Sequence, residues 1–76
     1  MEEFRKYFRA WYEVCRDGQE FSEQGKAILR KLYDAVPKEI DFARFMDAFM
    51  MRPTFNIDAS EEWMMAWLED EMRKVS

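Results

Sequence analysis

The sequence has no histidine, one cysteine, two glycines and two prolines among its 76 residues. Without histidine, the chain lacks the most common general base in proteins and the most common zinc ligand. A single cysteine, Cys15, excludes an intramolecular disulfide and a cysteine-based metal cluster. The scarcity of glycine and proline argues against disorder and against an all-β fold built on tight turns. We therefore expect a non-catalytic protein with no cofactor and no metal.

Long apolar runs are also absent. No stretch approaches the roughly 18 consecutive apolar residues that a membrane-spanning helix needs. The opening segment, MEEFRKYFRAW, is charged throughout and has no apolar region of the kind found in secretory signals. The sequence therefore predicts a cytoplasmic protein that does not enter a membrane.

Apolar material is plentiful, and charge is unevenly distributed. Hydrophobic residues make up 49% of the chain and aromatic residues 17%, which is enough for the core of one domain of this length. Residues 1–38 carry 8 Lys or Arg and 7 Asp or Glu, whereas residues 39–76 carry 4 and 9. The C-terminal half should therefore repel nucleic acid and attract basic surfaces.

Four segments show the spacing of apolar residues that is typical of amphipathic helices. The first extends from about Glu2 to Asp17, and Gly18 follows it, where a left-handed residue often ends a helix. The second begins near Ser22, a favourable N-cap. It should end near Val36, because a proline comes next and disfavours helical geometry in the residue before it.

The third segment has Asp41 as its N-cap, with Ile40 placed to pack on Phe45 as a hydrophobic staple. Its predicted inward face consists of Phe42, Phe45, Met46, Phe49 and Met50. The fourth segment follows the loop RPTFNI and has Asp58 as its predicted cap. Its apolar residues are Trp63, Met64, Trp67, Leu68, Met72 and Val75, of which Met64, Trp67, Leu68 and Met72 should face inward with Trp63 at the margin. We therefore predict an all-α fold, a compact single-domain bundle of about four short helices over residues 1–76.

The stretch LYDAVPKEIDFARFMDAFM (residues 32–50) resembles half of an EF-hand, in which a calcium loop leads through an Ile-Asp-Phe step into a helix. Such a loop needs oxygen ligands at its first, third and fifth positions and a bidentate Glu at the twelfth. Counted from Asp34, the third, fifth and twelfth positions are Val36, Lys38 and Phe45. The resemblance therefore implies an EF-hand-like adaptor that does not bind calcium.

Acidic residues, methionine and tryptophan concentrate in the C-terminal half. Methionine is common where a surface must adapt to a partner, and aromatic residues and methionine are enriched in interface cores. The apolar faces exceed what a bundle of this size can easily cover, so an exposed remainder is expected. The predicted partner-binding residues are Glu61, Glu62, Met65, Glu69, Asp70, Glu71 and Met51. Of these, Met65 and the acids Glu62, Glu69 and Asp70 should lie at or near the surface, with Met65 at the edge of the acidic side of the fourth helix.

Small size, acidity and the lack of catalytic residues resemble the general profile of phage-encoded inhibitors of host machinery, including anti-CRISPR proteins. That profile implies an inhibitor or regulator whose acids occupy a basic surface of a target protein, and a homodimer is another use of the same surface. The alternative is a nucleic-acid-binding regulator that uses basic residues of the first two helices. These residues are Arg5, Arg9, Arg16, Lys26 and Arg30. Neighbouring acids weaken their field, whereas nucleic-acid-binding proteins usually carry a clear basic excess.

Overall fold

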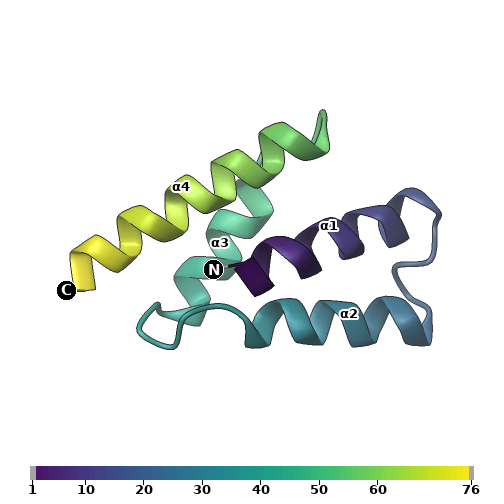
Figure 1. Cartoon of the computed structure of the whole chain (residues 1–76), viewed down its shortest axis with the longest axis horizontal. Helices are drawn as coiled ribbons and strands as arrows, with labels where there is room; N and C mark the ends of the chain where they lie inside the picture. The colour runs from purple at the N-terminus through teal and green to yellow at the C-terminus, as the bar shows by residue number, and fades with distance from the viewer. Residues whose placement is uncertain (1, 76) are drawn as a thin grey trace. The chain divides into compact units, whose positions relative to one another are not determined.

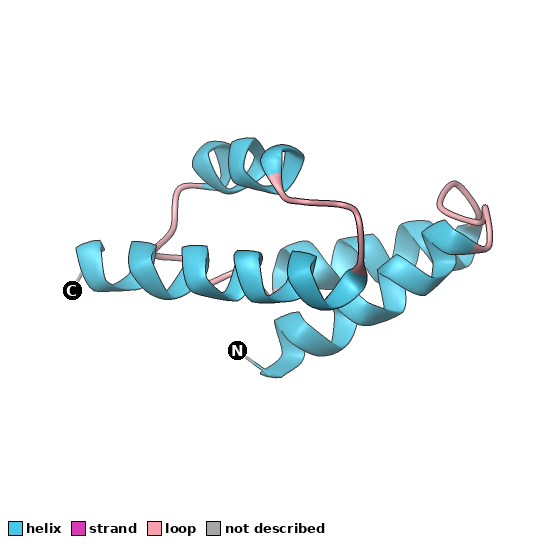
Figure 2. Ribbon diagram, turned by 90° about the horizontal axis from the view of Figure 1, so that it is seen from above, coloured by secondary structure: helices cyan, strands magenta, loops and turns pink. Residues whose placement is uncertain are grey.

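The computed structural model describes residues 2–75, which form four α-helices and no β-strand (Figures 1 and 2). The helices are α1 (Glu2–Arg16), α2 (Glu23–Asp34), α3 (Phe42–Met51) and α4 (Ile57–Val75). The predicted all-α fold with about four short helices is confirmed. These helices fall into two compact units that divide between Val36 and Pro37, and the prediction of a single domain stays a prediction. No helix in the described part of the chain combines the length and apolar content that crossing a membrane requires.

In the N-terminal unit, α1 and α2 run in opposite directions and pack side by side (Figure 1). Phe4 and Phe8 of α1 and Leu32 of α2 are buried. The rings of the two phenylalanines are stacked, with centroids 5.9 Å apart. Between the helices, Lys31 Nζ lies 5.8 Å from the centre of the Tyr7 ring, a cation–π contact that joins α2 to α1.

The predicted left-handed glycine after the first helix is confirmed, since Gly18 has a φ of +73°. Its N–H donates to the carbonyl of Cys15, and the N–H of Gln19 donates to the carbonyl of Val14. This pair of bonds is a Schellman motif, which satisfies the last carbonyls of α1 and turns the chain toward α2.

The start of α2 depends on a serine and a glycine. Ser22 Oγ accepts a hydrogen bond of 3.0 Å from the N–H of Gly25, which confirms Ser22 as the N-cap. Gly25 is buried against the preceding loop. A Cβ atom there would lie 2.4 Å from the carbonyl oxygen of Gln19 and 2.8 Å from that of Glu20. Only glycine allows the loop and the first turn of α2 to approach this closely.

In the C-terminal unit, α3 crosses α4 obliquely (Figure 1). Phe45 stacks on Phe49 within α3, with ring centroids 5.6 Å apart, and contacts Trp67 of α4 at 6.3 Å. Asp41 Oδ1 accepts a hydrogen bond of 3.3 Å from the N–H of Ala43, which confirms Asp41 as the N-cap of α3. The buried apolar residues of this unit are Ile40, Phe45, Ala48, Phe49, Met64, Met65 and Leu68.

The predicted inward face of α3 is only partly correct. Phe45 and Phe49 are buried, but Phe42 is 46% exposed and Met50 is 78% exposed. The buried side also includes Ala48, two positions before Met50. Because residues two apart point to different sides of a helix, burial of Ala48 leaves Met50 facing solvent.

The predicted cap of α4 is wrong. The helix begins at Ile57, and Asn56 rather than Asp58 supplies the cap. Asn56 Oδ1 accepts a hydrogen bond of 2.7 Å from the N–H of Ala59. Asparagine is as good an N-cap as aspartate, so the helix can start earlier. Asp58 then lies in the first turn, where its negative charge favours the positive end of the helix dipole.

Candidate functional site

The connection between α3 and α4 presents three large apolar side chains to solvent. Met50 and Phe55 are each 78% exposed, and Met51 is 77% exposed. They lie within six consecutive residues, in the last turn of α3 and in the loop that follows it. Single exposed apolar residues are ordinary, whereas several close together indicate an interaction surface. We call these three residues the turn patch.

The loop that carries Phe55 and follows Met51 is held by side-chain hydrogen bonds. The hydroxyl of the fully buried Ser60 donates to the carbonyl of Pro53. Arg52 Nη1 donates to the carbonyl of Phe49 at 2.6 Å, and its guanidinium lies 4.1 Å from the centre of that phenylalanine ring. Asn56 fixes the end of the loop as the cap of α4. A loop fixed in this way loses little conformational entropy when a partner binds.

Negative charge begins within one helical turn of the turn patch. Asp58 follows Phe55 by three residues, and Glu62 lies one turn further along α4; both acids are exposed. Glu69 and Asp70 are also exposed, so the predicted surface position of Glu62, Glu69 and Asp70 is confirmed. The exposed side of α4 is therefore an acidic surface that starts beside the apolar turn.

Met65 is buried, at 8% exposure, so its predicted surface position is wrong. The buried stripe of α4 is centred on Met64 and Leu68, both at 0%. On one edge it extends to Met65, and on the other edge Trp63 and Trp67 are only half-buried. The helix is thus rotated slightly from the predicted orientation, because its buried stripe lies further toward Met65 than the pattern of large apolar residues indicates.

Two of the predicted contact acids, Glu61 and Glu71, are also buried, at 8% and 6% exposure. Glu71 Oε1 accepts a hydrogen bond of 2.6 Å from Arg44 Nη2 of α3 and lies 3.6 Å from Lys74 Nζ. The hydrogen bond from Arg44 lowers the pKa of Glu71 below its ordinary value of 4.5, because it stabilises the carboxylate. Glu71 therefore helps to hold α3 on α4 and is not a free contact group.

Of the remaining acids, Asp70 forms an exposed pair with Lys74 at 3.3 Å. Glu62 and Glu69 form no ion pair with any other residue in the range 2–75. Exposed pairs of the Asp70 type contribute little to stability. Glu62 and Glu69 are therefore the acids of α4 whose charge is most available to a partner.

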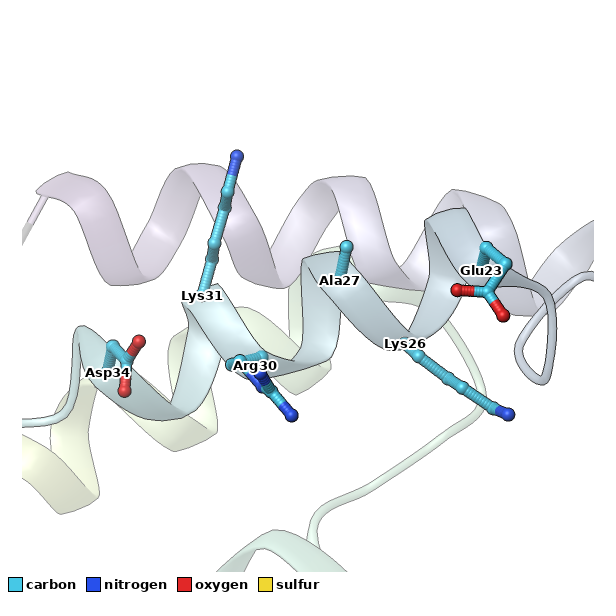
Figure 3. A pocket seen from close by; sticks show the side chains of 6 residues that line it. All are labelled: Glu23, Lys26, Ala27, Arg30, Lys31 and Asp34. Atoms are coloured by element: carbon cyan, nitrogen blue, oxygen red, sulfur yellow. The ribbon is translucent and has the colours of Figure 1, made fainter.

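All five predicted basic residues are exposed, and two of them, both on α2, line the same surface hollow. Lys26 and Arg30 line a surface hollow of about 490 Å³ on the outer side of α2. Figure 3 shows these two side chains pointing to the same side of the helix. Glu23 and Asp34 line the same hollow and offset part of its positive charge. The arginines of α1, namely Arg5, Arg9 and Arg16, do not line it.

The EF-hand-like segment has a carboxylate at the first calcium-loop position, Asp34, but not at the third, fifth and twelfth positions. Two of those positions are held by Val36 and Phe45, which are buried apolar residues at 8% and 0% exposure. Asp41 is committed to the cap of α3. Among residues 2–75, no three cysteine, aspartate or glutamate side chains come together in a way that could hold a metal ion.

Sequence reasoning missed Phe55 and Phe21, which is 82% exposed. Both directly precede an N-cap, the position from which an apolar residue can pack on the fourth helical residue as a staple. The fourth residues are Ser60 and Lys26, which offer no apolar partner. Ile40, by contrast, precedes Asp41 and is buried together with Phe45, its predicted staple partner. An apolar residue directly before an N-cap is therefore expected to be exposed when the fourth residue of the helix is polar.

No protein-family model, curated protein or solved structure matches this chain. What the site does is therefore inferred from its own residues.

Proposed function

We propose that this chain is a non-catalytic protein-binding module, an inhibitor or regulator whose contact surface is the turn patch and the exposed acids of α4. One observation carries the proposal: Met50, Met51 and Phe55 are all at least 77% exposed, in the last turn of α3 and in a following loop that is fixed by hydrogen bonds. Aromatic residues and methionine inserted into a partner's pocket supply most of the binding free energy in many interfaces.

The charge beside the turn patch selects the kind of partner. Glu62 and Glu69 form no ion pair with a cation in the described residues 2–75, and residues 39–76 carry 9 acids against 4 basic residues. Complementary charge at the rim of an interface accelerates association and excludes wrong partners. The partner should therefore present a basic surface around an apolar pocket. An inhibitor of the phage type that covers a basic surface of its target would use this chemistry.

Affinity capture with matched variants tests the proposal. The chain is used to capture proteins from its native host, and the captured protein is then purified for binding measurements. Phe55→Ser should weaken that binding by about tenfold or more, the size of a typical hot-spot loss. Phe21→Ser is the control, since Phe21 is equally exposed at 82% but belongs to the other unit.

The charge contribution is measured on the same complex. Glu62→Gln with Glu69→Gln should lower the association rate and make that rate depend less on salt concentration, because rim charges act mainly on the association rate. If the Phe55→Ser and Phe21→Ser variants bind the partner equally well, the turn patch is not the contact surface. If sedimentation shows a dimer that Phe55→Ser dissociates, the turn patch serves self-association instead.

A second candidate function is nucleic-acid binding, and the hollow on α2 favours it. Lys26 and Arg30 lie together there and form no ion pair with any residue between 2 and 75. Retention on heparin and on DNA tests it. Lys26→Gln with Arg30→Gln should reduce retention and its dependence on salt, because each lost phosphate contact lowers the salt slope. Arg16→Gln with Lys38→Gln is the control, since it removes two exposed cations that do not line the hollow. Equal retention of both double variants would reject this function.

A further inference from the structure

The chain contains two pairs of adjacent methionines with opposite environments. Met50 and Met51 are 78% and 77% exposed in the turn patch. Met64 and Met65 are 0% and 8% exposed in the buried stripe of α4. Because both pairs lie in the same unit, any reagent that reacts with the thioether group meets two similar targets that differ mainly in accessibility.

Peroxides react with the thioether of methionine without help from a metal or a base. The sulfur lone pair attacks one oxygen of hydrogen peroxide, the O–O bond breaks, and the other oxygen leaves as water after proton transfer. Sulfur is oxidised by two electrons, the peroxide is reduced, and the product is methionine sulfoxide. Exposure therefore decides which methionine reacts first.

We propose that Met50 and Met51 are an oxidation site, at which hydrogen peroxide converts the turn patch from an apolar to a polar surface and so releases the bound partner. The loss of binding rests on the proposed function of the turn patch. A sulfoxide oxygen is a hydrogen-bond acceptor, and burying it in an apolar pocket without a donor is costly. Methionine sulfoxide reductases reverse the change, so the site can act as a switch.

The hydrogen bonds that hold the loop do not involve either methionine side chain. They join Ser60 to Pro53, Arg52 to Phe49, and Ala59 to Asn56. Oxidation of the exposed pair therefore changes the polarity of the surface and leaves the fold of the unit intact. Oxidation of the buried pair would place polar sulfoxides in the core and unfold it.

The first test needs no partner. The protein is treated with hydrogen peroxide, and the oxidation of each methionine is followed over time by peptide mass spectrometry. Met50 and Met51 should oxidise at least about tenfold faster than Met64 and Met65, whose reaction requires local opening. The far-ultraviolet circular dichroism should stay unchanged while the exposed pair is oxidised. Equal rates for the two pairs would overturn the proposal.

The second test measures how oxidation changes the polarity and binding of the turn patch, and it compares the wild type with a variant whose turn patch contains no methionine. Met50→Leu with Met51→Leu keeps the patch apolar and conserves volume. Peroxide treatment should lower retention on a phenyl column for the wild type and leave the variant unchanged. With the captured partner, oxidised wild type should lose binding at least about tenfold, whereas the treated variant should still bind.

The results separate the two proposals. If no partner is captured, the proposed function fails, while the oxidation rates and column retention still decide whether the methionine pair is an oxidation site. Unchanged retention of the wild type, or full partner binding after oxidation of both methionines, would overturn the switch.

Discussion

Arg44, near the start of α3, donates a hydrogen bond of 2.6 Å to Glu71, near the end of α4. The Glu71 side chain is only 8% exposed, whereas that of Arg44 is 57% exposed. A cation at the solvent edge thus neutralises a carboxylate that the packing of α4 has buried. Removing the cation would leave the carboxylate charge buried without its main partner, which is strongly unfavourable.

This pair predicts a specific dependence of stability on pH. The folded-state pKa of Glu71 is lowered, mainly by the hydrogen bond from Arg44, so the folded state holds the proton less tightly than the unfolded state does. The resulting stabilisation is fully present above the ordinary pKa of 4.5 that the unfolded state has, and it is lost as pH falls through the lower folded pKa. Urea unfolding should show that Glu71→Gln is less stable than wild type at pH 7 and that the difference shrinks below pH of about 4.

Asp70→Asn is the matched control for that measurement. It removes a neighbouring carboxylate from the same helix, but Asp70 is exposed and forms an exposed pair with Lys74. Its effect on the free energy of unfolding should be small at every pH, because exposed pairs contribute little. A constant difference between Glu71→Gln and wild type from pH 7 to pH 3 would show that ionisation of Glu71 does not stabilise the fold.

Substitution of the two glycines should have different effects on the stability of the protein. Helix propensity alone predicts that Gly25→Ala stabilises the protein by about 1 kcal/mol. The structure predicts destabilisation by about 1–3 kcal/mol, because the new Cβ would lie 2.4 Å from the carbonyl oxygen of Gln19 and the loop would have to move. Gly18→Asn should be nearly neutral, because asparagine tolerates a positive φ and the space around Gly18 is open. Thermal unfolding of both variants measures the difference, and a stabilising Gly25→Ala would contradict the close approach.

The helix ends could be predicted from the sequence wherever the capping hydrogen bond joins residues that are close in the sequence. Ser22, Asp41 and Gly18 act through backbone groups two to five residues away, so a short stretch of sequence contains all the interacting groups. The start of α4 was missed for a related reason. Asn56 and Asp58 are both good caps, and the hydroxyl bond from Ser60 to Pro53 favours the earlier start by holding the first turn against the loop.

The buried side of α4 could not be predicted, because it depends on groups far away in the sequence. Glu71 is buried because Arg44, 27 residues earlier, supplies its counter-charge. On the other edge of the stripe, Glu61 and Met65 lie four residues apart and are both buried, so a pattern that counts acids as exposed ends the stripe too early on that edge. Of the two methionines predicted as contact residues, Met51 is exposed and Met65 is buried, whereas Met50 and Phe55 were not predicted as contacts.

The N-cap of α4 predicts how fast one backbone amide, that of Ala59, exchanges its hydrogen with solvent. Asn56→Ala should cost about 1 kcal/mol, because the N–H of Ala59 loses its hydrogen bond of 2.7 Å. Hydrogen exchange at the amide of Ala59 should accelerate in this variant and stay nearly unchanged in Asp58→Ala. Acceleration in Asp58→Ala alone would instead identify Asp58 as the cap.

The buried position of Met65 and the exposed position of Met51 are tested by one substitution made at each residue. Glutamine is close to methionine in length and shape, so the change mainly adds a polar amide. At Met65, which is 8% exposed, Met65→Gln should cost about 1–3 kcal/mol, because the amide is buried without water. At Met51, which is 77% exposed, Met51→Gln should change the free energy of unfolding by less than about 0.5 kcal/mol. Chemical denaturation measures both, and equal costs would place both methionines in the same environment. A nearly neutral Met51→Gln that also loses partner binding would separate the binding surface from the core, because stability and affinity would then depend on different methionines.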